Sequence, residues 1–221
     1  MRRPILRYGY ALVLLLLAGG VVSTSGCRAV LTTAAYLIHG TDVDAKYDCL
    51  NDKTVAVVCR TSGDLDYRDS SVAGDLAKKV GMLLRQNNRK IKVVDHRKVA
   101  AWMDENSWDE FAEIGEALDA DMVLGIDLAS FTIYESPTLY QGKADVSFEV
   151  FDRGQDSSVI AEEMLPRTLH PPNVPVPTSD RPEREFRHEF VAVLADRIGR
   201  YFYPHSPYAD YATDAQAHSG R

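Results

Sequence analysis

The sequence predicts a single α/β domain of the α+β type, with helices packed on a mixed sheet of about five strands. Two observations lead to this fold class. Apolar runs at strand spacing alternate with stretches at helical spacing, in the order strand, helix, strand, helix, strand, strand, strand, helix. The composition, with 45% hydrophobic residues, 26% charged residues and three cysteines in 221 residues, excludes a disulfide scaffold, a coiled coil or a wholly disordered chain.

The first 26 residues have the anatomy of a signal peptide. Three arginines lie among the first seven residues, an apolar run covers residues 11–22, and small residues precede Cys27. A membrane-spanning helix needs about 20 apolar residues, and this run is shorter. We therefore predict that residues 1–26 are cleaved from the mature protein.

This segment resembles a bacterial lipoprotein signal, in which the cysteine after the cleavage site is acylated. Ser25 and Gly26 fit the lipobox, whereas Thr24 stands where an aliphatic residue is usual. The resemblance implies that acylated Cys27 holds the chain on a membrane leaflet, and Arg28 resembles the residue found in outer-membrane lipoproteins. The alternative is an ordinary secretory cut near residues 24–26 that leaves Cys27 unmodified.

The charge of the chain argues against a polyanionic partner. The formal net charge is −7, and loss of the three signal arginines makes it −10. One dense basic stretch, residues 85–98, is interrupted by apolar residues at strand spacing, so we expect no nucleic-acid partner. No feature of the sequence indicates an oligomeric state.

The amino-terminal half of the mature chain reads as a tether followed by alternating strands and helices. Residues 27–52 suggest a tether with an edge strand near 43–50, before an α/β domain at 53–203. Because the run TVAVVC (54–59) is continuously apolar and β-branched, we expect a central strand buried on both faces. The next predicted elements are a helix from Ser70 or Ser71 to about Asn87, a strand at 91–94 and a helix at 98–103 capped by Asp95.

The carboxy-terminal half predicts a helix, a three-strand meander and a last helix. The motif Ser107 to Glu110 has the spacing of a capping box that begins the third helix. Six prolines in residues 166–182 predict an extended surface crossing without ladder or helix. The remaining predicted elements are strands at 122–129, 144–151 and 159–164, a last helix capped by Ser179 or Asp180 with Pro182 in its first turn, and a disordered tail at 204–221.

This order of elements resembles the small α/β domain shared by the TolB amino-terminal domain, the CsgG family and the LpoB-like activators of penicillin-binding proteins. The likeness rests on TVAVVC (54–59), VVDHRKVAAWM (93–103), IGEALDADMVLGIDL (114–128) and ADVSFEVFD (144–152), which cover about 100 residues with the intervening helix. It implies an envelope lipoprotein that binds another envelope protein, with no catalytic residues to carry over. Because the loops of the meander are too short for membrane-crossing hairpins, pore formation is not expected.

Motifs of catalysis and cofactor binding are missing from the sequence. Neither G-x-S-x-G nor a glycine-rich phosphate loop occurs, so we predict no enzymatic activity and no cofactor. His188 and Glu189 begin a zinc-protease motif, but Ala192 replaces the second histidine, so no metal site is predicted and this helix face is expected to be solvated. A hydrolase would need His96 or His170 beside a nucleophile.

An acidic turn after the first strand could form a ligand edge made by Asp64, Asp66 and Asp69. A calcium loop fails here because Arg68 occupies a ligand position and Asp69 stands where glycine is required. We favour a solvated acidic turn. The alternative function is a soluble secreted ligand- or cation-binding domain that uses residues 64–69.

Cysteines and aromatic residues each leave two interpretations. Cys49 and Cys59 lie ten residues apart and could form a disulfide worth about 2 to 3 kcal/mol, although a plain buried thiol at Cys59 is the favoured interpretation. Aromatic side chains anchor protein interfaces, and a group of them could form a partner surface, although about half are expected in the core. These are Tyr134, Tyr140, Tyr201, Phe202, Tyr203, Tyr208 and Tyr211.

Overall fold

The computed structural model describes residues 42–61, 70–155 and 158–208. The chain divides at Val43, and all described helices and strands belong to the unit Val43–Arg221. In chain order they are β1 (Thr54–Thr61), α2 (Ser70–Asn87), β2 (Lys92–Val93), α3 (His96–Glu105), α4 (Phe111–Ala117), β3 (Met122–Ser136), β4 (Leu139–Asp152), a 3-10 turn (Arg153–Gln155), β5 (Ser158–Met164), β6 (Thr168–His170), β7 (Val176–Pro177) and α5 (Glu183–Gly199).

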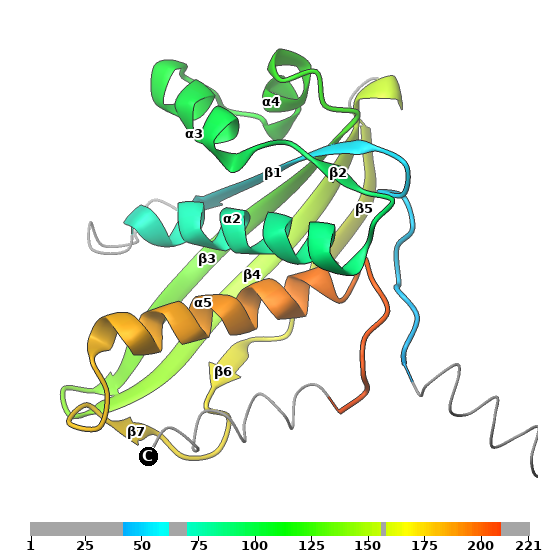
Figure 1. Ribbon diagram of the computed structural model, residues 1–221. Coiled ribbons are helices and arrows are strands. Elements are labelled where there is room, and N and C mark those ends of the chain that lie inside the picture. The colour runs from blue at the N-terminus through cyan, green and yellow to red at the C-terminus, as the bar shows by residue number, and fades with distance from the viewer. Residues whose placement is uncertain (1–41, 62–69, 156–157, 209–221) are drawn as a thin grey trace, which may run out of the picture. The chain divides into compact units, whose positions relative to one another are not determined.

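The described strands form one mixed sheet of seven, with the main order β2-β1-β3-β4-β5. β1 is parallel to both β2 and β3, and β3, β4 and β5 form an antiparallel meander. Figure 1 shows α2 and α5 lying across this sheet, with α3 and α4 grouped near one end of it. The predicted α/β class, mixed sheet and meander are confirmed; the structure adds β6 and β7 to the five expected strands.

β1 is central because its side chains reach two cores. Val55, Val57 and Cys59 belong to the cluster beneath α2 and α5. Ala56 and Val58 point to the opposite face and pack with residues of α3 and α4. Alternate residues of a strand face opposite sides of the sheet, so the continuous apolar run predicted a strand buried on both faces, and this is confirmed.

The two long helices cover one face through apolar stripes at helical spacing. On α2 the spacing predicts a stripe of Val72, Leu76, Val80, Leu83 and Leu84; Leu83 is half-buried and the other four are at most 1% exposed. On α5, Phe186, Phe190, Leu194 and Ile198 are fully buried in the same cluster. These two stripes pack on one face of the sheet, and the strands supply the larger share of this core.

Helices α4 and α5 begin at residues other than those predicted. For α5 the N-cap is Pro182, and no side chain caps the helix. A proline disfavours the α conformation in the residue before it, so Arg181 stays outside and neither Ser179 nor Asp180 can be the cap. The acidic residues Glu183 and Glu185 occupy the first turn, where the helix dipole favours negative charge.

The capping box of α4 lies three residues later than predicted. Glu110 is the N-cap, and the Glu113 carboxylate accepts the Glu110 backbone N–H at 3.0 Å. The burial of Phe111, which is 1% exposed and packs on Trp108, fixes the start of the helix. In α3, by contrast, Asp95 is the N-cap as predicted, and its carboxylate accepts the backbone N–H of Arg97.

The Pro-rich segment pairs with the sheet, which corrects the predicted surface crossing. β4 is 14 residues long, and β5 covers only its end from Ser147 to Asp152. β6 pairs with Gly142–Ala144 and β7 with Leu139 and Tyr140, so both satisfy the part of β4 that β5 leaves open. The residues between the prolines keep their N–H groups, and this is why ladders form where none was expected.

The two ends of the described body meet, where the sequence predicts an edge strand near 43–50 and a disordered tail from residue 204. Residues 43–50 form no strand; Val43 makes an isolated antiparallel bridge with His205. Residues 204–208, predicted as part of a disordered tail, therefore include one paired residue. Residues 209–221 lie outside the described part of the chain.

Candidate interaction surface

One face of the sheet is covered by α2 and α5, and the other by α3 and α4. The β3–β4 hairpin extends beyond α3 and α4. Near the start of β3, Val123 and Gly125 are buried, and the ring of Phe111 packs so closely on Gly125 that a Cβ there would lie 2.5 Å from it. From Asp127 onward this face is accessible to solvent, and Thr132 is exposed. β4 alternates between half-buried and buried residues from Leu139 to Val150. One half of the sheet is therefore covered on a single side only.

We call this accessible area the open face. Its residues come from four adjacent strands. The polar ones are Arg60, Asp127, Ser130, Thr132, Lys143, Asp145, Ser147, Glu149 and Glu162. Met164, the cross-strand neighbour of Ser147, adds an apolar residue that is 81% exposed.

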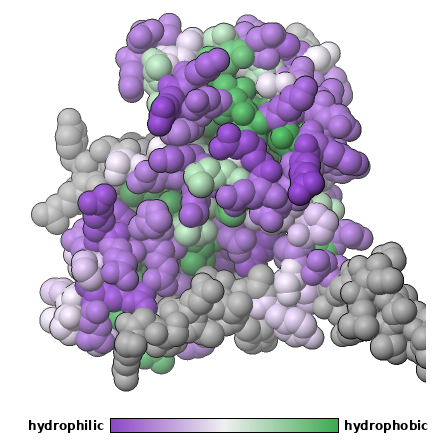
Figure 2. Space-filling model, viewed as in Figure 1, coloured by the Kyte–Doolittle hydropathy of each residue, from purple (hydrophilic) through white to green (hydrophobic). Residues whose placement is uncertain are grey.

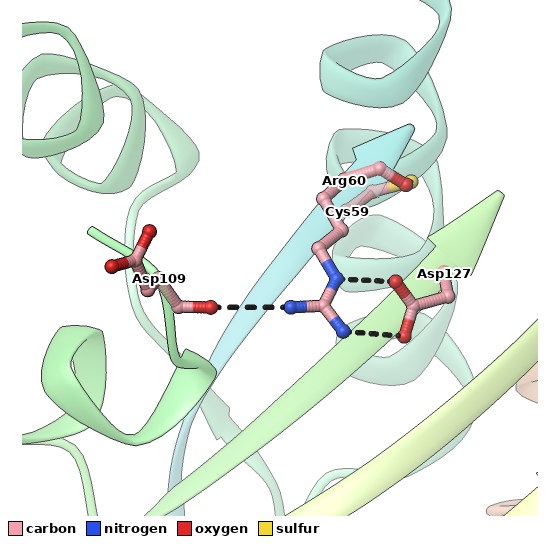
Figure 3. Close-up of polar contacts among 4 residues, drawn as sticks. All are labelled: Cys59, Arg60, Asp109 and Asp127. Carbon is pink, nitrogen blue, oxygen red and sulfur yellow. Dashed lines mark hydrogen bonds and ion pairs between the residues drawn. The ribbon is translucent and has the colours of Figure 1, made fainter. Parts of the chain in front are cut away.

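An ion pair between neighbouring strands, drawn in Figure 3, lies at the end of the open face nearest α4. Arg60 and Asp127 are paired in the register of β1 and β3. The guanidinium donates two hydrogen bonds to the carboxylate, through Nε and through Nη2, the latter at 3.1 Å. Its Nη1 donates to the carbonyl of Asp109 at 3.2 Å, and the group lies 4.4 Å from the ring centre of Phe111. Arg60 thus ties the sheet to the start of α4.

Carboxylates gather next to this pair. Burial, and then the charges of Asp127 and Glu162, raise the pKa of Glu149, while Arg60 acts in the opposite direction. Glu149 and Glu162 are direct cross-strand neighbours. Like charges that face each other across a ladder are destabilising, so this spot favours a cation from outside.

Further along the face, a second bidentate pair holds Asp145. Its carboxylate accepts hydrogen bonds from Arg167 at 2.8 and 2.6 Å and from Ser130 at 2.7 Å. These bonds lower the pKa of Asp145 to about 2. The open face therefore presents charges that ion pairs orient on a paired hairpin.

Another ionic cluster lies within the core that α5 forms with the sheet. His170, on β6, is 2% exposed, and its Nε2 lies 2.9 Å from Oε1 of Glu189 on α5. Arg181 donates to the other carboxylate oxygen. Burial alone would raise the pKa of Glu189, but the hydrogen bond and charge of His170 and the charge of Arg181 outweigh it and lower the pKa.

This cluster corrects the solvated helix face predicted for His188 and Glu189. His188 is exposed, as expected, but Glu189 is half-buried and bonded to two other elements. His170 also stacks on Phe186 and Phe190. No local pattern in the sequence joins His170 to Glu189, because the contact depends on the pairing of β6 with β4.

The two described cysteines are free thiols. Cys59 is 4% exposed, and burial raises its pKa. Cys49 precedes β1 and is half-buried, and burial raises its pKa, whereas Cys59 lies in β1 and pairs with Ile126. The burial of Cys59 fits the plain thiol that the sequence favoured.

Several other residues singled out in the sequence can now be placed. Cys27, Asp64, Asp66 and Asp69 lie outside the described residues, as does Tyr211. Asp95 caps α3, the Arg97 backbone hydrogen bond lowers the pKa of its carboxyl group, and this group lies 3.4 Å from Nδ1 of His96. Among the aromatic residues, Tyr140, Phe202 and Tyr203 are buried, whereas Tyr134 and Tyr208 are exposed.

A cavity of about 300 Å³ lies where the two ends of the body meet, between residues 43–46 and the end of α5. Two of its cations already have partners: Lys46 pairs with Glu163, and Arg200 pairs with Asp196.

In the part of the chain that the structure describes, no helix is both long and apolar enough to span a bilayer.

Comparisons with known proteins give similarities of structure only. No protein-family model and no curated sequence matches the chain. In structure the chain is similar to a PelC variant dodecamer from Paraburkholderia phytofirmans, with 12% identity and a TM-score of 0.45 over 73% of this chain and 96% of that one. It is also similar to lipoprotein GNA1162 from Neisseria meningitidis, with 8% identity and a TM-score of 0.42 over 66% and 96% of the two chains.

The LpoB carboxy-terminal domain from Salmonella enterica is a third similar structure, with 13% identity and a TM-score of 0.32 over 54% of this chain and 82% of that one. LpoB belongs to the group that the sequence phrases resemble. At these TM-scores the correspondence of the chain paths is partial.

Proposed function

We propose that this chain is a non-enzymatic, lipid-anchored protein of the bacterial envelope that acts by protein-protein contact in envelope assembly or maintenance. It would face the periplasm from the outer membrane. The anchor rests on the sequence before the described body, and the contact rests on the open face.

Support for the anchor comes from Cys27 and the signal that precedes it. Each acyl chain contributes about 0.8 kcal/mol per buried methylene group, and two chains on one cysteine hold a protein stably on a leaflet. Fifteen residues, 28–42, would then connect the anchor to the body that begins at Val43.

The observation that carries the contact function is the open face. Its side chains lie on paired strands and are oriented by ion pairs, so little conformational freedom is lost when a partner binds. Glu149 and Glu162 bring two carboxylates together. We therefore expect the partner to place a cationic side chain against this pair.

Site-specific photo-crosslinking in envelopes tests the contact. A photoreactive residue at Thr132, exposed on the open face, should capture one envelope protein, and the same residue at Ala100, exposed on α3, should not. Charge reversal by Glu149→Lys should abolish the Thr132 adduct. No adduct at Thr132, or equal capture at both positions, would remove the open face as the contact site.

The anchor is tested separately by labelling with radioactive palmitate. The native protein should carry label and fractionate with membranes, whereas Cys27→Ser should carry no label. An unlabelled native protein would contradict the anchor and leave the contact proposal standing on its own test.

A further inference from the structure

A concave surface lies at the β2 edge of the sheet, between α2, β2 and the start of α3. It encloses a cavity of about 320 Å³. Val57, Val93 and Val94 contribute apolar lining. Figure 2 shows hydrophobic surface above α2, bordered by hydrophilic residues. A volume of this size is at the lower end of the range for small-molecule sites.

Cationic side chains from two helices line this cavity. Lys78 and Arg85 come from α2, seven positions apart and hence on the same face, and His96 and Arg97 come from the first turn of α3. The lining contains one carboxylate, Asp95, which is engaged by the backbone N–H of Arg97. We call this lined cavity the basic cleft.

Local geometry explains why these cations converge. Gly81 of α2 sits over β2 so closely that a Cβ would lie 3.2 Å from Val93 Cγ1. β2 has only two residues, so the chain turns at once into α3. Arg97 is therefore brought beside a helix that ends ten residues earlier in the sequence.

Lys78, Arg85 and Arg97 of the basic cleft have no carboxylate partner among the described residues, as is also true of Arg89, Arg184 and Arg197, whereas His96 Nδ1 lies 3.4 Å from the Asp95 carboxylate. Elsewhere in the described ranges, carboxylates pair with Arg60, Arg153, Arg167, Arg181, Arg187 and Arg200. No carboxylate of the described residues lies within ion-pair distance of the Lys78, Arg85 or Arg97 side chains. Unpaired cations gathered around a cavity favour an external anion.

The charge distribution along the chain points the same way. Residues 76–98 contain eight Lys and Arg against one Asp, in a chain whose formal net charge is −7. The basic residues are thus concentrated at one edge of an acidic protein. Such a concentration attracts anions at long range and is weakened by salt.

We propose that the basic cleft binds a phosphate group attached to an apolar moiety, either a phospholipid headgroup or a soluble phosphate ester. Guanidinium groups bind phosphate oxygens with paired hydrogen bonds, and a lysine adds a point charge. The apolar lining accommodates the carbon part of the ligand. The α3 terminus itself is already capped by Asp95, so attraction comes from the side chains.

Calorimetry on the full chain in nonionic detergent micelles provides the test. One arm titrates sn-glycerol 3-phosphate, and the other compares micelles doped with phosphatidylglycerol against micelles doped with phosphatidylcholine. Sodium chloride matches the ionic strength throughout. We expect saturable binding in at least one arm, weakened at least tenfold by Arg85→Glu with Arg97→Glu.

The matched control is Arg89→Glu with Lys90→Glu, which makes the same change in net charge on exposed residues outside the cleft. It should bind as the native chain does. The milder Arg85→Gln, at an exposed position, tests the site even if the double reversal does not fold. Saturation by glycerol phosphate identifies a soluble ligand, and binding only to phosphatidylglycerol identifies a headgroup. Absence of binding in both arms, or an equal loss in the control, would overturn the proposal.

Discussion

His170 Nε2 lies 2.9 Å from Glu189 Oε1, and this hydrogen bond joins the Pro-rich segment to the middle of α5. Both partners are held by their surroundings, since His170 stacks on Phe190 and Arg181 donates to the other oxygen of Glu189. A carboxylate at this position satisfies two largely buried donors at once. Its removal would leave buried polar groups without their partner.

Glu189→Gln is therefore expected to lower the free energy of unfolding at pH 7 by about 3 kcal/mol, the usual cost of breaking a buried ion pair. The folded pKa of Glu189 lies below its ordinary value of 4.5. Its contribution to stability is thus present above about pH 4.5 and is lost as the pH falls through the folded pKa. Urea unfolding between pH 7 and pH 3 measures both effects. A difference between native and variant that stays constant over this range would contradict the lowered pKa.

Gly125→Ala should destabilise the protein, because its new methyl group would lie 2.5 Å from the buried ring of Phe111. Overpacking of this kind costs about 1 to 3 kcal/mol. Gly74→Ala is the matched control, since Gly74 lies on α2 with nothing within 4 Å of the added atom. Alanine favours the helix by about 1 kcal/mol over glycine, so the control should be more stable than the native chain. Chemical denaturation checks the opposite signs, and the same sign in both variants would refute this packing.

The titration of Glu149 should respond in opposite directions to its two charged neighbours. Arg60 lowers the pKa of Glu149 and Asp127 raises it. Arg60→Gln is therefore expected to raise that pKa further, and Asp127→Asn to bring it down. Carbon NMR of the Glu149 carboxyl group measures the shift directly. If neither substitution moves the titration, the charges of the open face are not coupled as the geometry indicates.

The fold could be predicted where the decisive pattern was local. The run at 54–59 predicts β1 because every residue in it is apolar, and the stripe from Val72 to Leu84 predicts α2 because its spacing is helical. The start of α4 could not be settled in this way, since Ser107 and Glu110 both allow a capping box. Burial of Phe111 decides between them, and burial is a property of the whole fold.

The same distinction applies to the candidate sites. Alternation in the segment 144–151 predicts a polar face on β4, but the position at which α4 stops covering that face does not follow from it. β6 was missed because the prolines around it argue against pairing, while the unpaired half of β4 provides the reason for it. The basic stretch at 85–98 was visible in the sequence, but its convergence with Lys78 requires the packing of α2 against β2.

The bridge between Val43 and His205 determines how the molecule would carry a mechanical load. Two backbone hydrogen bonds, of 2.8 and 3.0 Å, join these residues, and Tyr47 N–H donates to the carbonyl of Tyr201 a short distance further in. Tension applied at Val43 is therefore shared with the segment that follows α5 before it reaches β1. Stretching would break these few hydrogen bonds first, and the sheet would remain intact while the segment before β1 extends.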